Sequence, residues 1–136
     1  MNWKSKSFVF AILMAIFAFA CGKEDDNPDL VSGIWTVESV TGGIAGTGYI
    51  PNFKTVEFSE NKFYKLQMNS NLISEGEYEL YEKDSDVWIH FWPKQPDNPL
   101  PFEGFDKKVT TGNDVLTLTD RCCDLYVYNF VRATQQ

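Results

Sequence analysis

Histidine, cysteine and basic residues are all scarce in this chain, and each scarcity excludes a class of function. The 136 residues include one histidine and three cysteines. A Ser-His-Asp or Cys-His catalytic site would need that histidine, His90. It lies in the middle of a strand-like run between Trp88 and Trp92, so we interpret it as a half-buried strand residue rather than a catalytic base. We therefore predict that the protein is not an enzyme.

Sequence motifs for metals and phosphates are also missing. Cys122 and Cys123 are adjacent, without the C-x-x-C spacing and the second ligand pair that a zinc site needs. Asp84 and Asp86 resemble a fragment of a calcium loop, but its glycine and its distal glutamate are absent. No glycine-rich phosphate loop joins a strand to a helix. The sequence therefore predicts neither a metal nor a cofactor.

The first twenty residues predict export. Lys4 and Lys6 precede an uncharged run of 13 apolar residues from Phe8 to Ala20, and Cys21 follows directly. This order matches the regions of a secretory signal, and the run is too short for a transmembrane helix, which needs about 20 residues. A cysteine at the cleavage point resembles a bacterial lipoprotein signal, in which the cysteine sulfur receives a diacylglycerol. The alternative is a plain secreted protein in which Cys21 is incidental.

Residues 22–29 (GKEDDNPD) are acidic and contain no apolar side chain for a core, so they predict a flexible tether. The acidic run also resembles the export signal of Bacteroidota-type lipoproteins for the outer face of the outer membrane, and a solvated linker is the alternative. Without Lys4 and Lys6, the mature chain has 10 basic and 19 acidic residues and a net charge of −9. That charge argues against nucleic acid as a partner and against direct binding to anionic lipid. Attachment to a membrane would therefore depend on the lipid anchor.

The sequence divides into a signal (1–20), a lipidated Cys with an acidic linker (21–30) and one domain (31–136). No window of eleven or more residues in this domain repeats apolar positions at helical spacing; short β-branched and aromatic runs alternate with turn clusters instead. We predict an all-β, antiparallel, up-and-down barrel of about eight strands, because closure leaves no unpaired edge. The expected strands are Ile34–Val40, Thr55–Ser59, Lys62–Met68, Ile73–Tyr81, Asp86–Trp92, Phe102–Val109, Asp114–Thr119 and Cys123–Arg132.

Both ends of this domain resemble the lipocalin-like domains of Bacteroidota lipoproteins. Gly33-Ile34-Trp35 opens the first strand as the Gly-x-Trp signature of lipocalins does, and Arg132 closes the last strand. The resemblance implies that Trp35 plugs the closed end of the barrel and that Arg132 stacks on it, a contact worth about 0.5–2 kcal/mol. The domain is shorter than a typical ligand-carrying lipocalin, which argues against a deep cavity.

The pair Cys122-Cys123 has two interpretations. Neighbouring residues of a strand point to opposite faces, which disfavours an ordinary disulfide between them. Two separate thiols, one of them buried as a small hydrophobe, are favoured over a strained vicinal disulfide.

Trp88, His90 and Trp92 share one face of a predicted strand. They form an outward aromatic stripe if the alternate residues face the core, and they line the barrel interior if the parity is reversed. In a third arrangement, the loop Pro93–Pro101 folds back over them. We hypothesise that these three residues and Tyr49 contribute to one surface that recognises a ligand or partner.

Two function classes fit these observations. The expected one is a lipid-anchored binding protein that holds a small apolar or aromatic ligand in the barrel mouth, beside the loops Gly42–Gly48 and Pro93–Pro101. The other is a solid barrel that acts as an interaction, inhibitor or accessory module of an envelope complex. A filled barrel interior would argue against the first class.

The lipoprotein hypothesis makes a direct prediction for Cys21. Replacing Cys21 with Ser removes the sulfur that accepts the diacylglycerol, so the protein should leave the membrane fraction or remain as an uncleaved precursor. Membrane fractionation and gel migration measure both effects. A Cys21→Ser protein that fractionates and migrates like the wild type would show that the anchor is not at this residue.

Overall fold

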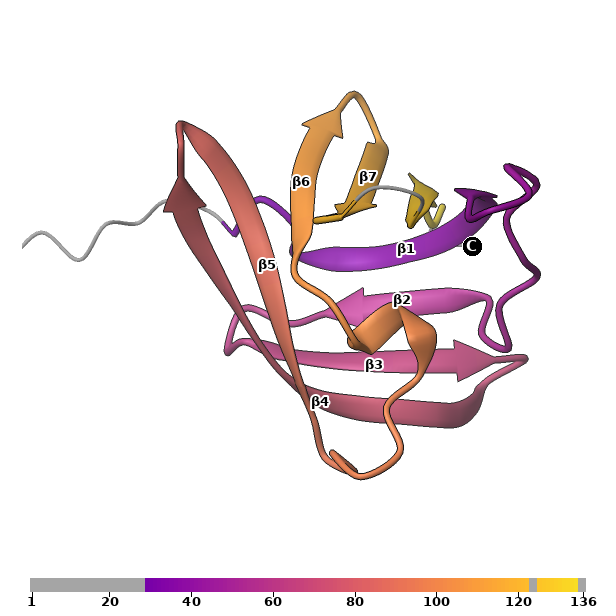
Figure 1. Cartoon of the computed structure of the whole chain (residues 1–136). Coiled ribbons are helices and arrows are strands. Elements are labelled where there is room, and N and C mark those ends of the chain that lie inside the picture. The colour runs from indigo at the N-terminus through magenta and orange to yellow at the C-terminus, as the bar shows by residue number, and fades with distance from the viewer. Residues whose placement is uncertain (1–28, 123–124, 135–136) are drawn as a thin grey trace, which may run out of the picture.

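Eight antiparallel strands close into a barrel in the computed structural model, which describes residues 29–122 and 125–134 (Figure 1). Each strand pairs with the next along the chain, and the last pairs with the first. The predicted up-and-down barrel is therefore confirmed. The strands are β1 (Gly33–Gly42), β2 (Thr55–Phe58), β3 (Phe63–Met68), β4 (Asn71–Lys83), β5 (Asp86–Pro93), β6 (Lys107–Gly112), β7 (Val115–Asp120) and β8 (Tyr126–Arg132).

Two tight hairpins fix the register around β4. Asn69 and Ser70 join β3 to β4, and Asp84 and Ser85 join β4 to β5; all four residues have positive φ values between 49° and 67°. Two consecutive residues of this kind form a turn whose twist matches that of the flanking strands. The long β4–β5 hairpin that results carries the outer surface described below (Figure 1).

The predicted strand Phe102–Val109 is wrong at its start. Phe102 belongs to a short 3-10 helix, η2 (Pro101–Glu103), and the strand begins only at Lys107. Proline suits a first helical turn because its φ is fixed and it has no N–H to satisfy. The side chain of Phe102, which follows Pro101, therefore enters the barrel and does not continue a strand.

Phe102 fills the barrel interior at the end where the long loops lie. Its side chain is fully buried, and its ring centroid lies 5.0–6.1 Å from those of Phe53, Phe91, Tyr128 and Phe130. Ring centroids at this separation are in favourable aromatic contact. In Figure 1, η2 is the short orange helix on the connection from β5 to β6, drawn in front of β2 and β3.

A charged pair lies inside this aromatic core. Lys107 and Asp120 are opposite each other on β6 and β7, and Lys107 Nζ lies 2.7 Å from Asp120 Oδ1 with both side chains buried. Asp120 Oδ1 has no hydrogen bond of suitable angle among the described residues, so charge attraction is its main interaction with the ammonium. Lys107 Nζ also donates to the Phe105 carbonyl at 3.0 Å. Burial lowers the pKa of Lys107, and the charge of Asp120 opposes that shift.

The contact expected at the other end of the barrel is confirmed. The Arg132 guanidinium lies 4.2 Å from the ring centroid of Trp35, which is buried. Trp35 Nε1 donates to the Val31 carbonyl at 2.7 Å, so its one polar atom is satisfied. Trp35 is therefore a buried structural residue, and its closure of the barrel end, which the resemblance implies, stays a prediction.

The membrane-related predictions concern a part of the chain that the structure does not describe. The predicted signal, Cys21 and most of the tether lie outside the described residues, as does Cys123. No helix of the described part is long and apolar enough to cross a membrane.

Trp35 should contribute strongly to stability. Trp35→Ala removes a buried aromatic ring together with the Arg132 contact, so we expect the free energy of unfolding to fall by about 3–5 kcal/mol. Urea or thermal unfolding of the purified protein measures this. As a control, Trp92→Ala removes a ring that is half exposed and should cost much less. Equal costs for the two variants would contradict the structural role of Trp35.

Candidate functional site

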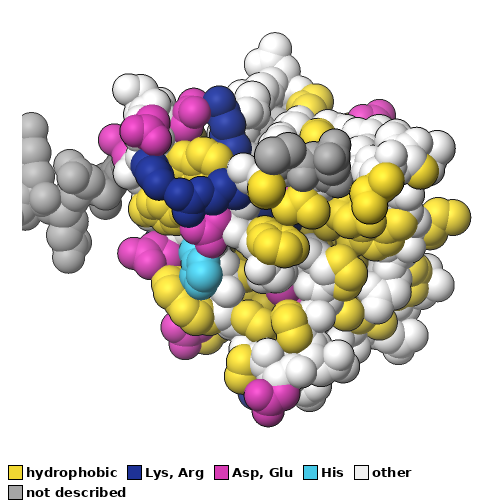
Figure 2. Space-filling model, viewed as in Figure 1, with side chains coloured by type: hydrophobic (Ala, Val, Ile, Leu, Met, Phe, Trp, Pro, Cys, Tyr) yellow, Lys and Arg dark blue, Asp and Glu magenta, His cyan; other side chains and the backbone are white. Residues whose placement is uncertain are grey.

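The outer surface of β5 carries the aromatic residues singled out in the sequence. Ile89 and Phe91 are buried in the core, whereas Trp88 and His90 are partly exposed and Trp92 is 48% exposed. Of the three arrangements considered, the outward stripe is therefore the one that the structure contains. The rings of His90 and Trp92 touch edge to face, with centroids 4.4 Å apart. Figure 2 shows the histidine on the surface, next to acidic and hydrophobic side chains.

Asp106 links this stripe to the loop before β6. His90 Nδ1 lies 2.5 Å from Asp106 Oδ1, and the Tyr81 hydroxyl donates to Asp106 Oδ2 at 2.5 Å. Arg121 Nη1 lies 4.0 Å from the same Oδ2, and its guanidinium is 5.9 Å from the ring centroid of Trp88. One carboxylate thus orients the histidine, a tyrosine and an arginine on the outer face.

The pKa of Asp106 reflects these partners. Burial by itself would raise the pKa, but the hydrogen bonds from Tyr81 and His90 and the charges of His90 and Arg121 outweigh it and lower the pKa below its usual value. The hydrogen bond to Asp106 raises the pKa of the Tyr81 hydroxyl. Asp106 is therefore an anion at neutral pH, and Tyr81 is its donor.

The structure packs Tyr49 against other partners. Its ring centroid lies 4.7 Å from that of Tyr126, and its hydroxyl is 3.1 Å from the hydroxyl of Tyr128, a buried residue of β8. The three β5 residues are thus on one outer face, while Tyr49 covers the edge of the core. Its contribution to the same recognition surface stays a prediction.

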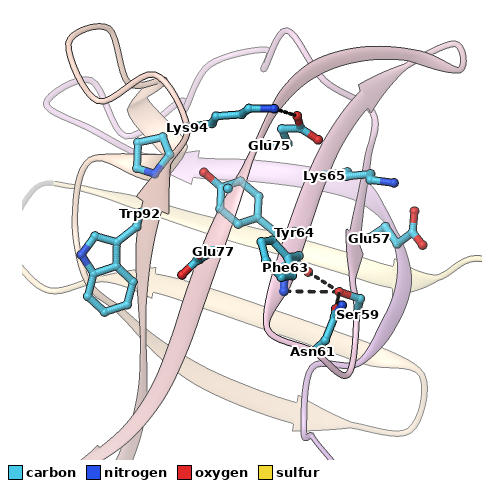
Figure 3. Close-up of a pocket in the computed structure, with 12 residues that line it drawn as sticks. Glu57, Ser59, Asn61, Phe63, Tyr64, Lys65, Glu75, Glu77, Trp92 and Lys94 are labelled. Carbon is cyan, nitrogen blue, oxygen red and sulfur yellow. Dashed lines mark hydrogen bonds and ion pairs between the residues drawn. The ribbon is translucent and has the colours of Figure 1, made fainter.

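A groove on the outside of the barrel begins at Trp92. It has a volume of about 940 Å³ and crosses the outer surface of β2, β3, β4 and β5 (Figure 3). Gly76 lets β4 and β5 approach each other closely beside the groove. A Cβ at this position would lie 2.1 Å from the Trp92 carbonyl oxygen and would separate the two strands. The lining residues are Glu57, Ser59, Asn61, Phe63, Tyr64, Lys65, Glu75, Gly76, Glu77, Trp92, Pro93 and Lys94.

Two rows of cross-strand neighbours form the floor of this groove. The first row is charged: Glu57 pairs with Lys65, and Lys65 with Glu75, whose Oε1 accepts a hydrogen bond from Lys94 Nζ at 2.8 Å. That bond lowers the pKa of Glu75 and raises the pKa of Lys94. The second row places Glu77 between Phe63 and Trp92. The groove therefore joins a paired charged row to an aromatic row.

Sequence reasoning missed most of these neighbours. Alternation along a strand was enough to place Trp92 and His90 on the same face, but it gave no information on which strands would flank them. Phe63 and Glu77 become neighbours of Trp92 only through the strand register, and Asp106 lies in a loop with no local signal. The described residues contain no group of three or more His, Cys, Asp and Glu side chains placed to hold a metal ion.

Comparison with known proteins supports the fold. No protein-family model matches the chain, and no curated protein matches it. Among solved structures, the chain is similar to a DUF4847 family protein from Bacteroides vulgatus, with a TM-score of 0.53 and 13% sequence identity over 79% of this chain and 96% of the other. At this identity, the likeness concerns the fold alone.

Asp106 should make stability dependent on pH. Because its folded pKa is lowered, the ionised carboxylate stabilises the fold above its ordinary pKa of about 4, and this contribution is lost as the pH falls through the lowered value. We expect Asp106→Asn to lower the free energy of unfolding by about 1–3 kcal/mol at neutral pH and to flatten the acid limb of the stability profile. Urea unfolding at several pH values measures both effects.

Asp86→Asn is a suitable control, because Asp86 forms an exposed ion pair with Lys108. Exposed pairs contribute about 0–1 kcal/mol, so this variant should keep the acid limb. If the profile of Asp106→Asn ran parallel to that of the wild type, Asp106 would not be the titrating group.

Proposed function

We propose that this is a non-catalytic binding protein of the cell envelope, held in the outer membrane by lipid on Cys21. Its partner binds the outside of the barrel, on the face that Trp88, His90 and Trp92 share and in the adjoining groove. Support for the anchor comes from the charged start, the apolar run and the cysteine at the cleavage point. The acidic residues after Cys21 would hold the barrel away from anionic headgroups.

The packed interior is the observation on which this choice of surface rests. A small ligand in the mouth of a lipocalin-like barrel needs a cavity there. In this barrel, that space is taken by the Phe102 ring and by the pair Lys107 and Asp120, and Glu103 seals η2 onto the wall. Its carboxylate accepts hydrogen bonds from Tyr64 and Ser74 at 2.6 and 2.5 Å. Among the two function classes, a solid barrel acting as an interaction or accessory module is thus the better supported.

The outer face has exposed aromatic rings and open space for a partner. Phe63 and Trp92 are each about half exposed, and between them lies an open groove with charged and amide side chains. Exposed aromatic rings beside satisfied polar groups are typical of recognition surfaces, in which a few aromatic anchors provide most of the binding energy. A lipocalin-like ancestry is compatible with the Trp35–Arg132 contact at the closed end.

Native mass spectrometry can test the choice between the inside and the outside of the barrel. The full chain, purified from membranes in detergent, should give the mass of the lipidated polypeptide with no small molecule retained, because the buried side chains of Phe102, Lys107 and Asp120 occupy the interior. A molecule retained in one-to-one ratio with the lipidated chain would contradict a solid barrel.

Phe102→Ala provides the matched control for this experiment. It should destabilise the fold by about 3–5 kcal/mol and leave an apolar cavity of the kind that binds benzene. Benzene should then raise the melting temperature of Phe102→Ala and leave that of the wild type unchanged. A wild-type protein that benzene stabilises equally would reveal a cavity in the native barrel.

A further inference from the structure

A row of three side chains crosses the floor of the groove. Glu77 of β4 is the direct cross-strand neighbour of Phe63 on β3 and of Trp92 on β5, and Figure 3 shows its carboxylate between the two rings. Adjacent strands are about 4.8 Å apart, so the two rings flank the carboxylate at about one strand spacing on each side. Phe63 is 47% and Trp92 48% exposed. We call this set the aromatic–carboxylate row.

The protein uses the combination of aromatic ring and carboxylate elsewhere to hold its own cations. Arg132 lies over Trp35 at 4.2 Å and bonds Asp114 at 3.2 Å. A guanidinium or ammonium over an aromatic face is attracted by the negative face of the ring, and a nearby carboxylate adds charge attraction. Three more sets have the same composition: Lys62 with Tyr78 and Asp29, Lys107 with Phe102 and Asp120, and Arg121 with Trp88 and Asp106.

The aromatic–carboxylate row differs from these four sets because it has no cation of its own. Within residues 29–122 and 125–134, Glu77 forms no ion pair. The basic side chains around it have other partners: Lys62 bonds Asp29, Lys94 bonds Glu75, and Lys65 lies between Glu57 and Glu75 in register. The row is therefore open to a cation from outside.

We propose that the groove binds a basic segment of a partner protein, with one Arg or Lys side chain inserted between Phe63 and Trp92 and paired with Glu77. This proposal specifies the partner chemistry of the proposed function and rests on it. Charge complementarity supports a basic partner, because the mature chain has a net charge of −9. The groove, at about 940 Å³, also has room for residues on each side of the inserted one.

The charged row limits where an incoming cation can pair. Three glutamates and two lysines line the groove; Lys94 bonds Glu75, and Lys65 lies between Glu57 and Glu75 in register. A basic segment that crosses the strands would therefore place its cation at Glu77. At the end of the groove, Ser59 Oγ already bonds Asn61 Oδ1 and the Phe63 backbone, so the donor there for the backbone of such a segment is the Asn61 amide N–H group.

Binding of a labelled hexa-arginine peptide to the full chain in a polyoxyethylene detergent tests this site. Fluorescence anisotropy gives the Kd for the wild type and for Glu77→Gln, Trp92→Ala and Phe63→Ala. All three positions are on the outer face, and Glu77→Gln keeps the shape of the side chain, so a thermal melt should confirm that the variants fold. Glu77→Gln should weaken binding about fivefold or more, because it removes the charge that pairs with the guanidinium. Each aromatic variant should weaken it about two- to fivefold.

Two variants separate this site from general attraction to an acidic protein. Glu38→Gln makes the same change in net charge on β1, outside the groove, and Phe105→Ala removes an exposed ring that does not line it. Both should leave the Kd within twofold of the wild type. Equal weakening by Glu38→Gln and Glu77→Gln, or no weakening by Glu77→Gln, would overturn the proposal.

A neutral hexasaccharide distinguishes failure of this inference from failure of the proposed function. If the saccharide binds in a Trp92-dependent manner while hexa-arginine binding is insensitive to Glu77, the outer face still binds a partner but the basic segment is wrong. If neither probe depends on the groove and the wild type retains a small molecule in native mass spectrometry, the outer-face function itself is wrong. Hexalysine in place of hexa-arginine shows which cation the row prefers, since a planar guanidinium stacks on rings better than an ammonium does.

Discussion

The ammonium of Lys107 inside the barrel is the constraint on which the rest of the structure depends. A buried lysine needs a paired carboxylate and further polar contacts, and a wrong register would leave both charges unpaired at a cost of several kcal/mol. Asp120 is its cross-strand partner, so the pair fixes the β6–β7 register. The Phe105 carbonyl ties the loop before β6 to the same ammonium, and Asp120 Oδ2 accepts from the Tyr126 backbone at the start of β8.

This central pair also helps to hold η2 over the barrel opening. The ammonium lies 5.3 Å from the ring centroids of Phe102 and Tyr128, so η2 is held over the opening by an electrostatic contact as well as by apolar packing. Glu103 adds hydrogen bonds from the barrel wall to the same helix. The half-exposed rings and the open groove lie instead on the outer face beside β5, which is why the proposed binding surface is there.

Cations over aromatic rings recur from the core to the surface of this barrel. Arg132 lies over Trp35, Lys107 lies in the core beside Phe102, and Arg121 lies near Trp88 on the outside, each with an aspartate nearby. Together with Lys62, these basic side chains have an aromatic ring and a carboxylate as partners at once. Glu77, between Phe63 and Trp92, is the same arrangement without a cation of its own in the described part of the chain.

The sequence by itself determined the local features, because alternation and turn chemistry act over a few residues. It predicted eight strands and the barrel, and it placed Trp88, His90 and Trp92 on one face. The contact of Trp35 with Arg132 was implied by the resemblance to lipocalin-like domains, not by local pattern. It could not predict that Phe102 would leave the strand pattern, since aromatic residues are typical of strands and the core contacts of this ring come from residues distant in the chain. Only the tertiary structure decided that the interior is filled, that Asp106 meets His90 and Tyr81, and that Glu77 lies between Phe63 and Trp92. The contacts of Asp106 and Glu77 join residues 14 to 25 positions apart, and strand register and loop closure, which depend on the packing of the whole barrel, bring them together.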